Sequence, residues 1–297
     1  MCAKSPKHTY DLIMVATGSQ RSLLEALIHS VDPHVGDLAV MLVVIYQGSE
    51  APPPVQHIHL QWENTGHSLA LSVARNRGLA LIEQAGYRAQ HLMFPDDDTV
   101  FPPAFFGCFS RRVKPGEAYL GRVLNAEDQK EYKPYPDRDI SGQDYALLPY
   151  VASVALLLPH EVVKKTGFFD ERLGAGAPWG SSEDLDYYLR CLAHATFHFC
   201  RDIYNLHPGR FAKYGQMKTN QIWRRFKAYS DGYYFVMFKH RQTIRLYKLP
   251  LRALGGALLS LLRGQFSLSR LYLRLFAYRL KLHGKMARHN PPFFQAS

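Results

Sequence analysis

Residues 38–46 decide the fold, because they read LAVMLVVIY and contain no charged side chain. A continuous apolar run of this length is typical of a strand in the centre of a parallel sheet, covered on both faces. Residues 10–17 (YDLIMVAT) and 90–94 (QHLMF) predict two further strands. Helical patterns follow Gly18 and extend over residues 68–84. This alternation predicts an α/β, Rossmann-like fold with a mostly parallel sheet and helices on both faces.

The rest of the chain continues this pattern and then changes in composition. Further strands are predicted at 55–60, 118–124 and 151–158, and a helix at 183–195. Residues 125–145 are polar and rich in turn formers, so a surface loop is expected there. After His207 the sequence becomes basic, aromatic and helical. We therefore expect an α/β domain over residues 1–210 and a basic helical region over 211–297.

The charge is divided unevenly along the chain. The net charge is +11, and residues 207–297 hold 18 Lys and Arg but one acid, Asp231. Such a basic tail indicates a polyanionic partner, either nucleic acid or an anionic lipid surface. Four cysteines without a CxxC pair favour a reduced, intracellular protein. The apolar run near the N-terminus, residues 12–16, is too short for a signal-peptide core, and no run approaches the length of a membrane span, which favours a cytoplasmic location.

Three adjacent aspartates, Asp96, Asp97 and Asp98, directly follow the strand at 90–94. In open α/β sheets, ligands bind beyond the carboxyl ends of the strands. Neighbouring carboxylates repel one another unless a cation compensates them, and hard oxygen ligands suit Mg²⁺ or Mn²⁺. The alternative is a solvated acidic turn or a helix cap near Thr99.

A second acidic pair, Glu183 and Asp184, opens the predicted helix at 183–195. A carboxylate in a first helical turn is kept ionised by the helix dipole, so Asp184 is a candidate general base. Ser181 with Asp184 also matches a capping box, which is the structural alternative. Trp179 precedes this pair and is a candidate stacking platform for a sugar, or simply a core residue.

Two cationic or titratable residues are candidates for phosphate and metal chemistry. Arg75, inside the helix at 68–84, is able to clamp a phosphate or a carboxylate, whereas Arg77 is more typical of an exposed helix surface. His207 is a candidate metal ligand or diphosphate contact, with a structural role as the alternative.

The basic region predicts an amphipathic helix over residues 267–288. Its basic sector contains Arg270, Arg274, Lys281, Lys285 and Arg288, and its apolar sector contains Leu268, Leu271, Leu275, Tyr278 and Leu282. Arg279 falls in the apolar sector. The preceding run at 253–262 is too short to span a membrane and is typical of an interfacial element. The alternative is a bundle that packs on the α/β domain with a solvated basic face. Membrane contact and this packing are compatible with each other.

Several of these motifs occur in an order that resembles a known family. The chain carries Thr17 and Arg21 after its first strand, then SLALSVARNRGLAL, then FPDDDT, then GFFDERLGAGAPWGSSEDLDYYLR. Over roughly residues 10–210 it is similar to family-2 glycosyltransferases of the GT-A fold, especially bacterial members that build surface polysaccharides.

The resemblance implies roles for individual residues. Asp96 and Asp98 would hold Mn²⁺ or Mg²⁺ on the diphosphate of a sugar nucleotide, and the imidazole of His207 is added as a further candidate ligand from its own chemistry. Asp184 would be the catalytic base of an inverting transfer. The resemblance places Thr17 and Arg21 at the nucleotide pocket and Arg75 near Asp96. From the residues themselves we add Gln47 and Asp97 to the donor site, and Trp179 and Glu183 to the acceptor side. Gln47 departs from the family, which commonly has an acidic pair after the second strand.

The expected protein is therefore an inverting hexosyltransferase of surface polysaccharide synthesis. It would take a nucleotide-diphosphate sugar as donor and a saccharide or polyprenyl-linked saccharide as acceptor. Its tail would bind the anionic inner face of the cytoplasmic membrane as a peripheral protein, without a specific nucleic-acid partner. A non-catalytic sugar-nucleotide-binding protein is the main alternative, because of Gln47, and a nucleic-acid-binding protein is a weaker one.

Overall fold

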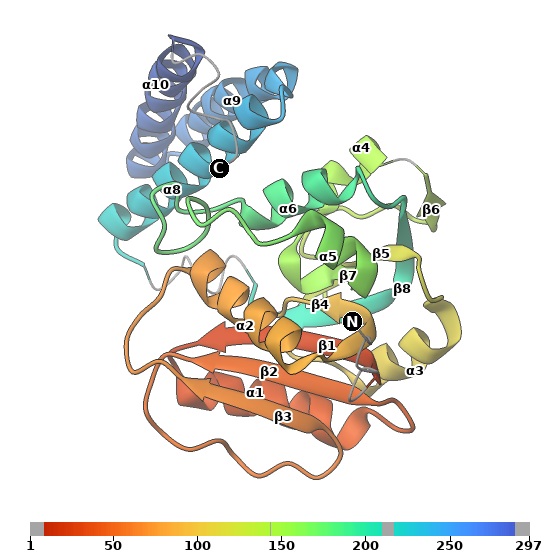
Figure 1. Ribbon diagram of the computed structural model, residues 1–297. Helices are drawn as coiled ribbons and strands as arrows, with labels where there is room; N and C mark the ends of the chain where they lie inside the picture. The colour runs from red at the N-terminus through yellow and green to blue at the C-terminus, as the bar shows by residue number, and fades with distance from the viewer. Residues whose placement is uncertain (1–8, 143, 210–216, 289–297) are drawn as a thin grey trace. The chain divides into compact units, whose positions relative to one another are not determined.

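The computed structural model describes residues 9–142, 144–209 and 217–288 (Figure 1). Within these ranges the chain forms two compact units, the first made of 9–171 and 184–209 and the second of 172–183 and 217–288. None of the helices in the described ranges combines the length and apolarity that a bilayer crossing requires.

The described part of the first unit contains a sheet of eight strands in the order β3-β2-β1-β4-β7-β5-β8-β6. Their bounds are β1 Thr9–Gly18, β2 Val40–Tyr46, β3 His59–Asn64, β4 Arg88–Met93, β5 Ala118–Asn125, β6 Ile140–Ser141, β7 Leu156–Pro159 and β8 Phe197–His207. Four pairs of strands are parallel, namely β1 with β2, β1 with β4, β2 with β3, and β5 with β8. β7 runs antiparallel between β4 and β5, and β6 runs antiparallel to β8. The predicted mostly parallel α/β sheet is confirmed.

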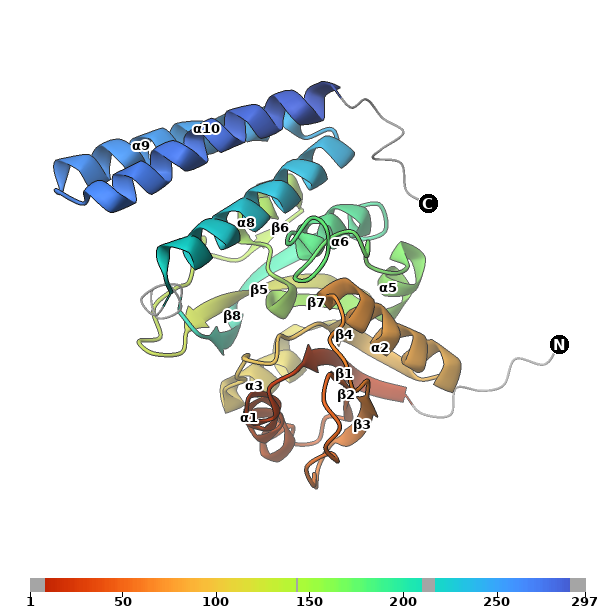
Figure 2. The same ribbon diagram turned by 90° about the vertical axis from the view of Figure 1, so that its left-hand side faces the viewer.

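Helices cover both faces of the sheet. Successive residues of a strand point to opposite faces, so each strand packs against helices on both sides. Leu12 and Met14 of β1 join an apolar cluster with helices α1 (Arg21–Val31) and α3 (Pro103–Arg112). Val15 points to the other face, where α2 (Leu71–Ala85) crosses β1. A Cβ at Gly78 of α2 would lie 2.5 Å from a Val15 methyl carbon, so this close approach requires glycine. Figure 2 shows α1 and α3 on one side of the sheet and α2 on the other.

The remaining short elements of this region follow the strands. They are η1 Asp32–His34, α4 Asp144–Leu147, η2 Leu148–Tyr150, η3 Ser153–Ala155, α5 His160–Thr166 and α6 Glu183–Cys191. α2 ends where Gly86 adopts the left-handed conformation, with φ of 72°.

Three strands differ from their sequence predictions. β3 covers 59–64 rather than 55–60, because it pairs with β2 in a register that joins Met41 to His59. β7 is confined to 156–159, since the residues before it form a 3₁₀ turn. β8 is not predicted, because an irregularity opposite β5 interrupts its alternation where the charged residues Arg201 and Asp202 occur.

The second unit is helical. It contains α8 (Thr219–Lys239), η4 (Thr243–Tyr247), α9 (Lys248–Leu262) and α10 (Phe266–Arg288). Arg279 of α10 donates to the Ser230 hydroxyl at 3.1 Å and to the Leu249 carbonyl at 2.8 Å, so it ties α10 to α8 and α9. Residues 172–183 belong to this unit although they precede residue 210 in the chain. The domain boundary at residue 210 stays a prediction.

Candidate active site

The triple aspartate lies at the carboxyl end of the sheet. β4 ends at Met93, and Asp96 makes an isolated parallel bridge with Thr17 at the end of β1. The N–H of Asp96 donates to the Thr99 hydroxyl at 3.2 Å, and the N–H of Thr99 donates back to the Asp96 carbonyl at 3.1 Å. The acidic turn is therefore fixed where open α/β sheets bind their ligands.

His207 is the last residue of β8, and it meets this turn. Val100 and Leu206 exchange backbone hydrogen bonds of 2.9 and 2.8 Å, which anchors the end of β8 beside the aspartates. His207 Nε2 lies 2.9 Å from Asp98 Oδ1 and 3.7 Å from Asp96 Oδ2. One ligand atom from each of these residues lies within 4.8 Å of the other two. We call Asp96, Asp98 and His207 the Asp-Asp-His group.

The chemistry of the Asp-Asp-His group fits a hard divalent cation. Two carboxylate oxygens and one imidazole nitrogen are ligands that Mn²⁺ and Mg²⁺ accept, with water or phosphate completing the coordination. Burial lowers the pKa of His207, but hydrogen bonds and the charges of Asp96 and Asp98 outweigh it and raise the pKa to about 9. A proton on the imidazole thus occupies the place that a metal ion would take.

Arg75 of α2 is fully buried beneath this group. One of its terminal nitrogens lies 2.9 Å from Asp96 Oδ1 and donates to the Ser153 hydroxyl at 3.0 Å. Burial alone would raise the pKa of Asp96, but His207 and Arg75 outweigh it, so the pKa is lowered. Arg75 therefore keeps Asp96 ionised and orients it, whereas Arg77 is half-exposed and pairs with Glu63. Nothing in the sequence around Ser153 predicts that it contacts Arg75.

Thr17, Gln47 and Asp97 surround the end of β1. The Gln47 amide donates to the Thr17 hydroxyl at 3.2 Å and accepts from the Leu69 N–H at 3.2 Å. A Cβ at Gly18 would lie 2.4 Å from Asp97 Oδ2, so the Asp97 carboxylate packs against Gly18 and lies outside the Asp-Asp-His group. Gln47 thus braces the loop ends around the predicted nucleotide pocket.

Arg21 opens α1 and contacts a different set of groups. Its Nε donates to Glu25 Oε1 at 2.7 Å, a terminal nitrogen donates to the Ala51 carbonyl, and its guanidinium lies 5.4 Å from the centre of the Trp62 ring. The sequence gives no hint of Trp62 as its neighbour. The nucleotide role of Arg21 stays a prediction.

Asp184 stands in the first turn of α6 and accepts the N–H of Leu185 at 2.7 Å. Burial raises its pKa, which the positive charges of Lys133 and Arg75 only partly offset, and the negative charge of Asp96 raises it further. Lys133 comes from the segment expected to be a surface loop, and it also donates to the Val151 carbonyl at 2.7 Å. A carboxyl with a raised pKa is suited to accept a proton.

An aromatic stack joins the acidic turn to α6. Phe94, Phe169 and Tyr187 pack together, with Phe169 and Tyr187 stacked at 4.0 Å and Phe94 set edge-on to Phe169 at 4.9 Å. Asn76 fixes Phe169 from α2, because its side chain accepts the Phe169 N–H at 2.7 Å and donates to the Phe169 carbonyl at 3.0 Å. Sequence reasoning identified Arg75 but not the role of its neighbour Asn76.

The predicted acceptor residues belong to the second unit. Trp179 stacks on Phe235 of α8 at 4.8 Å, and Glu183 is 8% exposed. The Ser181 hydroxyl donates to the Ala228 carbonyl of α8 at 3.1 Å. The acceptor roles of Trp179 and Glu183 stay predictions.

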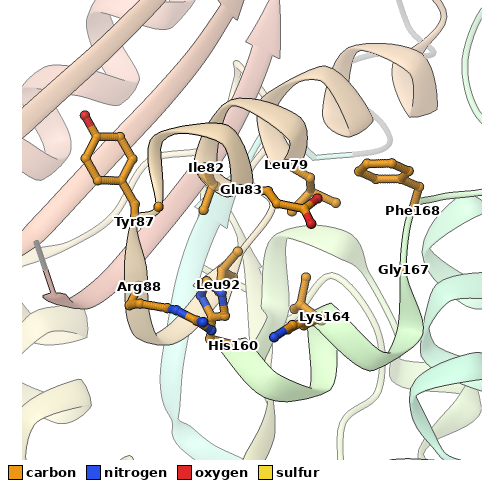
Figure 3. A pocket seen from close by; sticks show the side chains of 12 residues that line it. Leu79, Ile82, Glu83, Tyr87, Arg88, Leu92, His160, Lys164, Gly167 and Phe168 are labelled. Carbon is orange, nitrogen blue, oxygen red and sulfur yellow. The ribbon is translucent and has the colours of Figure 1, made fainter. Parts of the chain in front are cut away.

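A separate cavity lies between the C-terminal half of α2 and α5 (Figure 3). Leu79, Glu83, Arg88, His160 and Lys164 are among the residues that line it. None of the predicted site residues lines this cavity, and it adjoins Arg88, the first residue of β4. Because ligands of such sheets bind at the opposite strand ends, this cavity is not the candidate active site.

Comparisons with known proteins extend the fold assignment. No protein-family model and no curated protein matches the sequence. The chain is similar in structure to residues 1–349 of TarS from S. aureus, with a TM-score of 0.53 and 10% identity, over 94% of this chain and 89% of that one. It is equally similar to the mannosyltransferase PcManGT from Pyrobaculum calidifontis, solved with GDP-Man and Mn²⁺, with a TM-score of 0.53, 13% identity and the same coverage.

Proposed function

From the GT-A fold that the chain has, we propose that this protein is a metal-dependent glycosyltransferase that takes a nucleotide-diphosphate sugar as donor. The observation that carries the proposal is the Asp-Asp-His group at the carboxyl end of the sheet, with buried Arg75 behind it. A mannosyltransferase of similar structure was solved with GDP-Man and Mn²⁺, which supports the same class of donor and ion.

The residues divide the chemistry between them. Asp96, Asp98 and His207 would hold the cation, and a bound cation neutralises charge that develops on the departing diphosphate. Arg75 holds Asp96 ionised and oriented for that task. Asp184 accepts the proton of the acceptor hydroxyl as that oxygen attacks the anomeric carbon.

The finer assignments rest on the same residues. Asp184 as the proton acceptor fits a single displacement that inverts the configuration at the anomeric carbon. We assign the donor contacts to Thr17, Gln47 and the acidic turn. We further propose that the acceptor of the hexosyl group is a saccharide or a polyprenyl-linked saccharide. The reaction would belong to surface polysaccharide synthesis and take place at the inner face of the cytoplasmic membrane.

A donor screen tests this function. The purified full chain with Mn²⁺ is measured by thermal shift against a panel of nucleotide-diphosphate sugars, and release of nucleoside diphosphate is followed for each. One donor class should stabilise the protein and be hydrolysed slowly, and chelation of Mn²⁺ should remove both effects. Stabilisation without any hydrolysis or transfer would favour a binding protein, and no stabilisation by any sugar nucleotide would contradict the proposal.

A further inference from the structure

The helices α9 and α10 each expose large apolar side chains. Leu251, Leu258 and Leu262 of α9 and Phe266, Leu273 and Leu280 of α10 are between 47% and 85% exposed. Isolated exposed leucines are ordinary, but several large apolar side chains exposed along one side of a helix usually mark an interaction site. We call these six residues the leucine face.

Helical geometry groups each half of the leucine face into one stripe. At about 100° per residue, a spacing of seven returns to within about 20° of the same direction, which applies to Phe266, Leu273 and Leu280. The buried side chains Leu275 and Leu282 of α10 point roughly 170° away from this stripe. Packing inside the unit therefore uses one apolar side of α10, and the exposed residues of the leucine face form a second apolar side of this helix.

The surroundings of the leucine face carry charge of one sign. Residues 232–288 contain twelve Lys and Arg and no Asp or Glu. Arg270, Lys281 and Arg288 are exposed on α10 and lie about 60° to 80° around the helix from the centre of the apolar stripe. Arg279 is the exception, because it is hydrogen-bonded inside the bundle. An exposed apolar stripe edged by a basic row is the pattern of a helix that lies in a membrane interface.

We infer that the leucine face is the surface by which this protein inserts into an anionic lipid bilayer. Leucine and phenylalanine side chains would enter the boundary between headgroups and acyl chains, while the basic row pairs with anionic headgroups. A second copy of the chain is a poorer occupant, because it would bring two acid-free basic surfaces together. A polynucleotide would pair with the basic row but leave the leucines in water.

This surface deepens the proposed function, on which it rests, because it would bring the enzyme to a lipid-linked acceptor. It revises the sequence-based picture of the tail in one respect. The predicted apolar sector of α10, including Leu271 and Leu275, is buried within the bundle, and the lipid-facing residues are a different set on both helices.

Co-sedimentation with vesicles tests the inference on the full chain. Vesicles of phosphatidylcholine alone and with phosphatidylglycerol are compared at low and high salt. The wild type should sediment with the anionic vesicles, and high salt should release it only in part because apolar insertion is not screened. Leu258→Glu/Leu273→Glu should remove binding at both salt concentrations. Arg270→Gln/Lys281→Gln should weaken binding to anionic vesicles by about fivefold per charge removed.

The matched control is Tyr145→Glu/Phe168→Glu, which makes the same charge change at two side chains of the first unit with similar exposure, 50% and 49%. It should sediment like the wild type. A wild type that stays in the supernatant, or a Leu258→Glu/Leu273→Glu variant that still binds, would overturn the inference. So would loss of a dimer in that variant by light scattering, which would assign the face to self-association. Donor stabilisation, measured on the same samples, reports separately on the proposed function.

Discussion

Asp96 and Asp184 are two aspartates of one unit whose environments move their pKa values in opposite directions. Asp96 lies against buried Arg75 and beside His207, and its pKa is lowered. Asp184 stands in the first turn of α6, and burial raises its pKa although the charges of Lys133 and Arg75 act to lower it. Such a separation is how one site assigns different tasks to chemically identical side chains. It favours Asp96 as a permanent anionic ligand and Asp184 as the group that accepts a proton.

The largest expected effect comes from Asp184→Asn. The amide keeps the shape of the side chain but cannot accept the proton, so transfer should fall by about 100- to 10,000-fold. Donor binding, measured by calorimetry with Mn²⁺, should stay close to wild type. Near-normal turnover in this variant would remove Asp184 from the mechanism.

Asp98→Ala should affect metal and donor binding rather than proton transfer. It deletes one member of the Asp-Asp-His group, so Mn²⁺-dependent donor affinity should fall by at least about tenfold. Asp97→Ala is the matched variant, because Asp97 packs on Gly18 outside that group, and it should cost less. Equal donor affinity for wild type and Asp98→Ala, with and without Mn²⁺, would leave the triple aspartate as an acidic turn.

Arg75→Lys tests whether Asp96 needs its buried partner. Lysine keeps the charge but loses the rigid, planar guanidinium that aims one terminal nitrogen at both Asp96 and Ser153, so Mn²⁺ affinity should fall by about tenfold. Arg77→Lys, in the same helix and half-exposed, is the control and should have no measurable effect on the titration with Mn²⁺. If both variants bind Mn²⁺ alike, Arg75 is only a packing residue.

The smallest effect is a difference between two pH profiles. As the pH falls, Asp184 is protonated first because its pKa is raised, so the rate of transfer should decline while Asp96 remains ionised. Donor binding should therefore persist to lower pH than turnover does. Measuring kcat and the donor dissociation constant over the mildly acidic range checks this order, and coincident profiles would mean that both carboxyls serve one step.

Sequence reasoning predicted the parallel sheet and named the three members of the Asp-Asp-His group from separate segments. It singled out Asp96 and Asp98 because they directly follow an apolar strand, where parallel sheets bind ligands, and the structure places both beside His207. His207 was found without its structural reason, since the strand that carries it was not predicted. Its alternation is interrupted near Arg201, and only pairing with β5 shows that the segment is extended.

Other contacts are not readable from sequence, because they join distant irregular segments. Ser153 reaches Arg75 from a 3₁₀ turn, and Asn76 holds the backbone of Phe169, 93 residues further along. Lys133 approaches Asp184 from a segment whose composition predicts only a surface loop. The exposure of Leu258 and Leu273 also depends on which neighbours the helices find, which periodicity alone does not specify.

The parallel pairing of β8 with β5 has a consequence for how the protein folds. Asn125 pairs with His207 in this register, so a chain segment of about 80 residues must close before the pairing forms. Contacts that need such long closures form slowly and late. His207 reaches the aspartates only through this pairing, which makes completion of the Asp-Asp-His group a marker of completed folding. In refolding experiments, tight Mn²⁺ binding should therefore lag behind the gain of helical signal, and newly made chains should not capture the ion until the last parallel strand has docked.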